Sequence, residues 1–204
     1  MAGAAATVHS VEEYLRSVYR PDREFVDGEI QERKLGEWEH AEVQSALVGW
    51  FRAHRIDWEI RVFPELRVQV APTRFRVPDV CVLNQKAPRE KILTRPPLVC
   101  IEILSPKDRL SRTIQRDAGL GHRGPHSGAA PKRVARRQPR GAPRQSMERV
   151  EDYRRFGVPN IWIIDPSKRE GFDCRPDGLI RTIAFTAATG PVRLDLEQLF
   201  KDLD

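Results

Sequence analysis

The chain has 204 residues, of which 40% are apolar and 31% are charged. This length and composition suit one globular domain with a sizeable core. No window approaches the roughly 18 apolar residues that a membrane-spanning helix needs, and residues 1–14 lack the basic start and apolar run of a leader peptide. We therefore expect a soluble, cytoplasmic protein with no membrane partner.

The net charge of +6 comes from one segment, residues 117–146. This segment holds seven of the 35 Lys and Arg residues and one of the 29 Asp and Glu residues, which leaves 28 of each elsewhere. It has no aromatic residue and is dense in Gly, Ala, Pro and Arg, a composition that cannot build a core. We predict a disordered basic insertion in a single domain of residues 1–204, with charge suited to phosphate contacts.

The hydrophobic pattern before the insertion predicts a mixed α/β order. A capping box at Ser10–Glu13 indicates a short first helix, and Asp27-Gly28 between alternating residues indicates a hairpin. Apolar residues at helical spacing predict a helix over residues 38–54. Strands are predicted over residues 58–70, 77–83 and 98–104.

After the insertion, the pattern predicts four further elements: a helix that ends near Phe156, a strand over Asn160–Asp165, weaker strands to about residue 185, and a closing helix over Asp195–Leu203. Residues 108–116 and 150–157 would form one apolar helical stripe if they were joined. We therefore interpret the insertion as interrupting a helix. A frame error, a retained insertion or a real loop would each give this pattern.

The cysteines and tryptophans are expected in the core. Cys81, Cys100 and Cys174 lack the spacing of metal ligands, which favours buried thiols. The tryptophans lie in periodic apolar patterns, which predicts core or core-edge positions more than base-stacking platforms. They are Trp38, Trp50, Trp58 and Trp162.

One carboxylate interrupts the apolar run PLVCIEILSP at residues 97–106. Alternation places Glu102 on one strand face with Cys100 and Leu104, and an apolar run of this kind is covered on both faces. Glu102 would then be buried. An unpaired buried carboxylate is costly, so Glu102 needs a partner, a proton or a cation.

Asp79 repeats this pattern in RVPDVCVL, residues 76–83. Pairing of the two strands would bring both carboxylates close together. Like charges so placed resist ionising together unless a cation lies between them, and a hard ion such as Mg²⁺ suits an oxygen-only site. The alternative is neutralisation by structural arginines such as Arg74 or Arg76.

Pro78-Asp79 followed by Glu102 in a hydrophobic strand resembles the PD-(D/E)XK nuclease signature. Four blocks in this order, YRPDREFVDGEI, RFRVPDVCVL, RPPLVCIEILSPKDR and DYRRFGVPNIWIIDP, resemble more closely the Uma-two family of restriction endonucleases within that superfamily. The resemblance covers roughly residues 10–116 and 147–202. It implies an α/β, restriction-endonuclease-like core with a central mixed sheet flanked by helices.

The resemblance also implies a Mg²⁺ or Mn²⁺ site built from Asp79, Glu102 and the main-chain carbonyl of Ile103. The chain departs from the superfamily signature at Leu104, where a lysine would position and activate the attacking water. Family members of this kind supply the cation from the following helix, and the matching residue is Arg149.

Three further residues complete the set of candidates. Arg149 can stabilise developing negative charge but is a poor proton acceptor, because its pKa lies above about 12. Lys107 is the nearest lysine and the alternative cation. His40 matches a histidine of the family pattern and could reach the metal or a phosphate, or it could make only a local hydrogen bond at a helix start.

These features predict a Mg²⁺-dependent endonuclease that hydrolyses phosphodiester bonds of DNA, and a homodimer is compatible with them. One alternative is a catalytically inactive nucleic-acid-binding member of the same fold, which Leu104 and the interrupted helix favour. Another is a chain that no longer folds properly because residues 117–146 are foreign to it.

Overall fold

The computed structural model describes residues 8–33, 37–105 and 144–203. Six strands form its central mixed sheet: β3 (Ile60–Pro64), β6 (Val80–Asn84), β7 (Val99–Ile103), β8 (Asn160–Asp165), β9 (Glu170–Arg175) and β10 (Gly178–Thr182). Their order across the sheet is β10-β9-β8-β7-β6-β3. Strands β7 and β8 are parallel and the other neighbours are antiparallel.

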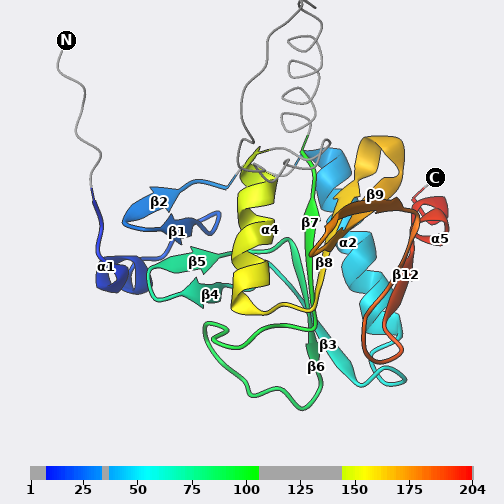
Figure 1. The fold of residues 1–204 in the computed structure, drawn as a ribbon, viewed down its shortest axis with the longest axis horizontal. Helices are drawn as coiled ribbons and strands as arrows, with labels where there is room; N and C mark the ends of the chain where they lie inside the picture. The colour runs from blue at the N-terminus through cyan, green and yellow to red at the C-terminus, as the bar shows by residue number, and fades with distance from the viewer. Residues whose placement is uncertain (1–7, 34–36, 106–143, 204) are drawn as a thin grey trace, which may run out of the picture.

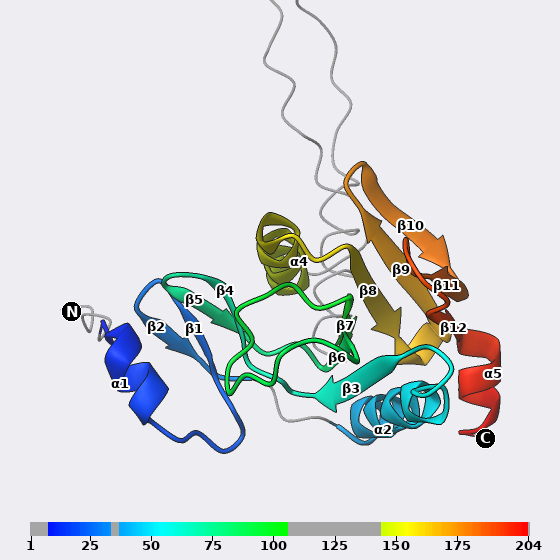
Figure 2. The same cartoon turned by 90° about the horizontal axis from the view of Figure 1, so that it is seen from below.

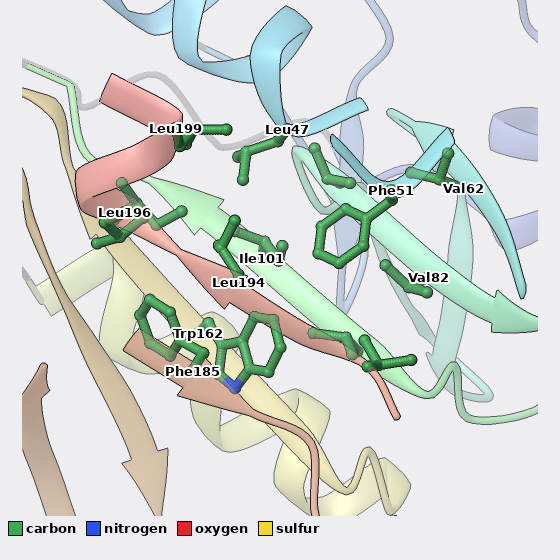
Figure 3. Packing of buried hydrophobic residues seen from close by; sticks show 14 of the residues in the cluster. Leu47, Phe51, Val62, Val82, Ile101, Trp162, Phe185, Leu194, Leu196 and Leu199 are labelled. Carbon is green, nitrogen blue, oxygen red and sulfur yellow. The ribbon is translucent and has the colours of Figure 1, made fainter. Parts of the chain in front are cut away.

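Helices cover both faces of this sheet (Figures 1 and 2). Helices α2 (Trp38–Ala53) and α5 (Leu196–Lys201) lie on one face, and α4 (Arg144–Phe156) lies on the other. Figure 3 shows Leu47 and Phe51 of α2 packing toward Ile101 of β7. On the opposite face, Val150 and Tyr153 of α4 pack with a second buried cluster.

A smaller antiparallel sheet lies beside the central one and is covered by α1 (Val11–Arg16) (Figure 2). Its order is β2-β1-β5-β4. These strands are β1 (Glu24–Val26), β2 (Glu29–Gln31), β4 (Val68–Ala71) and β5 (Arg74–Arg76). Tyr14, Phe25 and Phe75 form its separate aromatic core. The remaining elements are η1 (Pro166–Lys168), β11 (Ala184–Thr186) and β12 (Arg193–Asp195).

This architecture confirms the expected fold class and most of the expected elements. Ser10 and Glu13 form the capping box at the start of α1. Asp27 and Gly28 both have positive φ, as a tight hairpin between β1 and β2 requires. The helix over residues 38–54 is α2, and the closing helix is α5 with Asp195 as its N-cap.

The single strand expected over residues 58–70 is wrong. Two strands replace it, β3 in the central sheet and β4 in the small sheet. The break falls at Glu65, whose φ of 51° turns the chain out of the extended conformation. Residues 77–79 likewise connect the two sheets. The strand predicted over residues 77–83 therefore begins at Val80, as β6.

The predicted basic insertion lies largely outside the described residues, as do residues 108–116 of the proposed interrupted helix. The last three residues of the segment, 144–146, belong to α4. The helix therefore begins at Arg144 and not at Val150, and Ser146 is already buried. A helix forms here from 13 residues that include none of residues 108–116.

The buried-thiol prediction is confirmed, since Cys81, Cys100 and Cys174 are all free and buried. Trp58 and Trp162 are also buried. The prediction is wrong for Trp38, which is 82% exposed because it precedes the buried stripe of α2 and points away from the sheet. No helix in the described part of the chain is both long and apolar enough to cross a membrane.

Gly171 on β9 tests how tightly the α2 side of the core is packed. A Cβ there would lie 2.5 Å from Cζ of Phe185 and 2.8 Å from the carbonyl oxygen of Ile163. Phe185 is stacked on buried Trp162 and has little room to move. We expect Gly171→Ala to lower the free energy of unfolding by about 1–3 kcal/mol, measured by urea denaturation. An unchanged unfolding midpoint would contradict this packing.

Candidate functional site

Asp79 and Glu102 lie opposite each other on two neighbouring strands. The β6–β7 register pairs Val80 with Ile101, so one further step places Asp79 across from Glu102. Both carboxylates are buried. The strand pairing that the sequence suggested therefore brings the two acids together.

The Asp79 carboxylate is held by three donors. Its Oδ1 accepts a hydrogen bond from Nη2 of Arg33 at 2.6 Å, and its Oδ2 accepts one from the backbone amide of Ile103 at 2.7 Å. Nε2 of His40 lies 3.3 Å from Oδ2. Gln44, one turn further along α2, donates to the Asp79 carbonyl at 2.9 Å. Asp79 is thus fixed by the α2 helix and by the neighbouring strand.

The Glu102 carboxylate faces α4. Its Oε1 accepts a hydrogen bond from the Tyr153 hydroxyl at 2.6 Å, and its Oε2 accepts one from Nη1 of Arg149 at 2.7 Å. Arg149 and Tyr153 are four residues apart and therefore share one face of the helix. This helical spacing explains how one turn of α4 supplies both donors.

A buried ion-pair network extends from Glu102 into the small sheet. Nε of Arg149 lies 3.2 Å from Glu24 on β1, and Glu24 also accepts from Nη1 of Arg76 at 2.8 Å. Arg76 is fully buried, and its Nε donates to Asp152 of α4 at 2.7 Å. Four elements, β1, β5, β7 and α4, are therefore joined by alternating acids and arginines.

The local electrostatics shift the pKa values of Asp79 and Glu102 in opposite directions. Burial raises the pKa of Glu102 to about 7, with the charge of Asp79 adding to the rise and Arg149 opposing it. Burial also acts to raise the pKa of Asp79, but His40, Arg33 and the Ile103 amide outweigh it and hold that pKa below its ordinary value. Two nearby carboxylates with separated proton affinities are common at functional sites.

His40 shows the reciprocal effect. Burial acts to lower its pKa, but the hydrogen bond and charge of Asp79 raise it above the ordinary value. His40 therefore does more than make a local hydrogen bond at the start of α2. It reaches the carboxylate that the sequence singled out.

The structure places the other candidate residues unequally. Arg149 reaches Glu102, whereas Lys107 lies outside the described residues. Leu104 is buried in the α4-side core, so no cation occupies the position of the signature lysine. Ile103 contributes its amide to Asp79, and the role of its carbonyl as a metal ligand stays a prediction.

The alternative of neutralisation by arginines is right in kind but names the wrong arginines. Arg74 and Arg76 pair with other acids, namely Asp27, Glu148, Asp152 and Glu24. The cations that meet Asp79 and Glu102 are Arg33 and Arg149.

Sequence reasoning missed Glu24, Arg33 and Tyr153. Glu24 carries the same signal as Asp79 and Glu102, because it precedes Phe25-Val26 in an extended run, yet a three-residue strand gives too little alternation to show burial. Arg33 follows the hairpin, where no periodicity places a side chain. Tyr153 fits the apolar stripe of α4 equally well as a core residue.

The oxygen atoms of Asp79 and Glu102 are suited in type to a hard divalent ion. Each oxygen already accepts a hydrogen bond or an ion pair, but a carboxylate oxygen has more than one lone-pair direction and can bind a cation as well. Within the described ranges, no group of three or more His, Cys, Asp or Glu side chains is arranged to hold a metal. A metal site at these two acids therefore stays a prediction.

The fold and this acid-centred site define a nuclease-like α/β protein. The model of the Uma2 family, described as "Putative restriction endonuclease", matches residues 11–203, and the chain belongs to this family. The chain is also similar to the crystal structure of a protein from Anabaena variabilis ATCC 29413, described as "a putative nuclease belonging to DUF820". That similarity has a TM-score of 0.65 at 21% identity and covers 93% of this chain and 96% of the other. No curated protein matches the chain.

Glu24 offers a test of the ion-pair network that supports the site. Burial acts to raise its pKa, but Arg149, Arg76 and the Val77 amide hold the pKa below its ordinary value of 4.5. We expect Glu24→Gln to lower the free energy of unfolding by about 3 kcal/mol at pH 7, because it leaves buried arginine charge uncompensated.

The pH dependence of this effect has a definite sign. A depressed carboxyl pKa contributes stability above the unfolded pKa that is lost as the pH falls through the folded pKa. The difference between wild type and Glu24→Gln should therefore be constant near neutral pH and narrow below about pH 4.5. Thermal unfolding from pH 7 to pH 3 measures this, with exposed Glu29→Gln as the matched control. A difference that widens with acidification would contradict the network.

Proposed function

We propose that this protein is a divalent-metal-dependent endonuclease that hydrolyses phosphodiester bonds of DNA. The observation that carries the proposal is the position of buried Asp79, just before β6, across from buried Glu102 on β7, with His40 and Arg149 beside them. Membership of a family described as "Putative restriction endonuclease" supports the nuclease assignment. The dependence on metal and the choice of DNA go beyond this family description and are part of our proposal.

Asp79, Glu102 and the carbonyl of Ile103 would hold the Mg²⁺ or Mn²⁺ ion, with water and a substrate phosphate completing the shell. When bound, the ion lowers the pKa of a coordinated water and polarises the scissile phosphate. Asp79 is already oriented for this role by the Ile103 amide and by Arg33. A rigidly held ligand is what a metal site with few protein donors requires.

The cations around the acids would bind and stabilise the phosphate. Arg149 is in contact with Glu102 and presents a guanidinium, whose planar donors match phosphate oxygens. His40 can hold a proton at Nε2, facing Asp79. Because arginine does not accept protons near neutral pH, Arg149 would stabilise charge and not act as a base. Lys107 remains the alternative cation.

A second candidate function is nucleic-acid binding without cleavage. Leu104 is buried in the core where the nuclease signature has a lysine, and Arg149 is engaged by both Glu102 and Glu24. A protein that had lost its catalytic lysine would keep the fold and the cations that meet phosphates. It would bind DNA in the absence of divalent metal and leave it intact in its presence.

Nicking of supercoiled plasmid DNA separates the two functions. We expect the full chain to nick the plasmid with Mg²⁺ or Mn²⁺ and to be inactive with EDTA. Asp79→Ala should lower the rate at least about 100-fold, because loss of a ligand exceeds the cost of losing its outer-shell support. Asp173→Ala, which removes an acid paired with Arg175 on the same strand, β9, is the matched control. DNA binding with no metal-dependent nicking by wild type would favour the second function.

The shared metal site has its own test in isothermal titration calorimetry. Glu102→Gln removes a carboxylate charge but keeps the size and hydrogen-bonding capacity of the side chain. We expect it to weaken Mg²⁺ binding at least about tenfold, the lower bound for disturbing a metal site. Glu151→Gln changes a half-exposed acid on the same region of α4 and should bind Mg²⁺ like wild type. Equal binding by wild type and Glu102→Gln would rule out a site shared by the two acids.

A further inference from the structure

The outer face of α2 carries a stripe of exposed residues. Trp38, Ala41, Ser45, Gly49 and Arg52 are all exposed and follow one another at steps of three or four, so they lie along one side of the helix. The opposite side packs on the central sheet. Trp38 is 82% exposed although tryptophan is the largest apolar side chain. An exposed tryptophan beside small residues is typical of an interface.

A groove runs beside this stripe, between α2 and α5. Its volume is about 590 Å³, and Trp38, Gly49 and Trp50 line it from α2. Leu199 of α5 and Leu203, just after this helix, contribute to its lining. Gly49 leaves the groove open at one end, because a Cβ there would meet no atom within 4 Å. The groove is therefore mainly apolar, and the exposed ring of Trp38 forms part of its wall.

We propose that this face binds a second copy of the chain, with the two α2 helices packed antiparallel around a twofold axis at Ser45. In that register Trp38 of one copy faces Arg52 of the other, and Ala41 faces Gly49. Ser45 faces itself. A closed twofold interface uses the same patch on both copies, so each copy supplies both the tryptophan and its receiving surface.

Charge and size both match in this register. The small residues Ala41, Ser45 and Gly49 let the two helices approach closely along the stripe. Arg52 of each copy comes over the ring of Trp38, a favourable cation–π arrangement. Arg52 also lies near Glu42, one turn beyond Trp38, which gives an ion pair at each end of the interface. In an antiparallel pair, the positive end of each helix dipole also lies beside the negative end of the other, which is favourable.

The register is what distinguishes a second copy from other occupants of the groove. A parallel arrangement would bring Trp38 against Trp38 and Arg52 against Arg52, leaving the charges unpaired. A peptide partner would not require the first and last turns of α2 to be complementary to each other. The reciprocal match of the first turn of α2 with its last turn favours self-association.

Sedimentation velocity of the full chain tests the proposal. We expect a species of twice the 23.4 kDa chain mass at micromolar concentration. Trp38→Ala should raise the dimer dissociation constant at least about 30-fold, as expected for an interface hot spot. Ile56→Ala removes another large exposed side chain, 72% exposed and outside the stripe, and should leave the constant unchanged. Circular dichroism of each variant reports whether the fold is kept.

Disulfide cross-linking tests the register. The three native cysteines are buried, so an introduced exposed thiol is the reactive one. Ser45→Cys should oxidise to a covalent dimer with copper phenanthroline, because Ser45 lies on the twofold axis. An equal mixture of Ala41→Cys and Gly49→Cys should form the mixed dimer. Neither should cross-link alone, since like positions are about 12 Å apart along the helix axis.

Each outcome decides the proposal. A chain that stays monomeric at tens of micromolar overturns it, including the case in which the groove binds a different partner. A dimer that is unaffected by Trp38→Ala and does not cross-link through Ser45→Cys uses another surface and also overturns it. Cross-linking of Ala41→Cys or Gly49→Cys alone would overturn the proposed twofold axis at Ser45. The predicted pattern of cross-links together with the weakened Trp38→Ala dimer establishes the interface.

Discussion

The arrangement of the molecule depends on the partly buried guanidinium of Arg149. It contacts Glu102 of the central sheet at 2.7 Å and Glu24 of the small sheet at 3.2 Å, while its backbone belongs to α4. Arg76 likewise forms ion pairs with two acids, Glu24 and Asp152. The aromatic core of the small sheet is separate from the two clusters on the central sheet. Val68 and Val70 of β4 also pack in the α4-side cluster, so apolar contacts and ion pairs together fix the two sheets relative to each other. Each unpaired member of the ion-pair network would cost several kcal/mol, on the order of 3–5.

The features predicted from the sequence are those set by local patterns. Two-residue alternation placed Glu102 with Cys100 and Leu104 on one face, and the structure has this arrangement. The same rule placed Asp79 with Cys81, but Asp79 lies just before β6 and contacts His40 of α2, whereas Cys81 packs in the α4-side cluster. The register of β6 and β7 still places Asp79 across from Glu102. Short elements with strong caps or turns, such as the Ser10 capping box, also follow from a few neighbouring residues.

The features that were missed depend on contacts between distant parts of the chain. The sequence of residues 58–70 has the pattern of one continuous strand. The turn at Glu65 is needed because the chain passes there from the central sheet to the small sheet. Glu24 and Arg33 acquire their positions from residues that are 125 and 46 positions away. Trp38 fits an apolar helical period, but which side of α2 meets the sheet is decided by Val43, Leu47 and Phe51.

The ion pairs of the site also constrain how it can work. Glu102 has one oxygen on Tyr153 and the other on Arg149, so a cation that binds Glu102 competes with Arg149 for negative charge. A phosphate offers the guanidinium a second anion of matching geometry. If substrate draws Arg149 away from Glu102, the carboxylate gains charge that a divalent ion can neutralise. Binding of phosphate and binding of metal would then favour each other, because each removes the electrostatic cost of the other. Glu24 would limit this exchange by keeping Arg149 attached to β1 while its other end turns toward the phosphate.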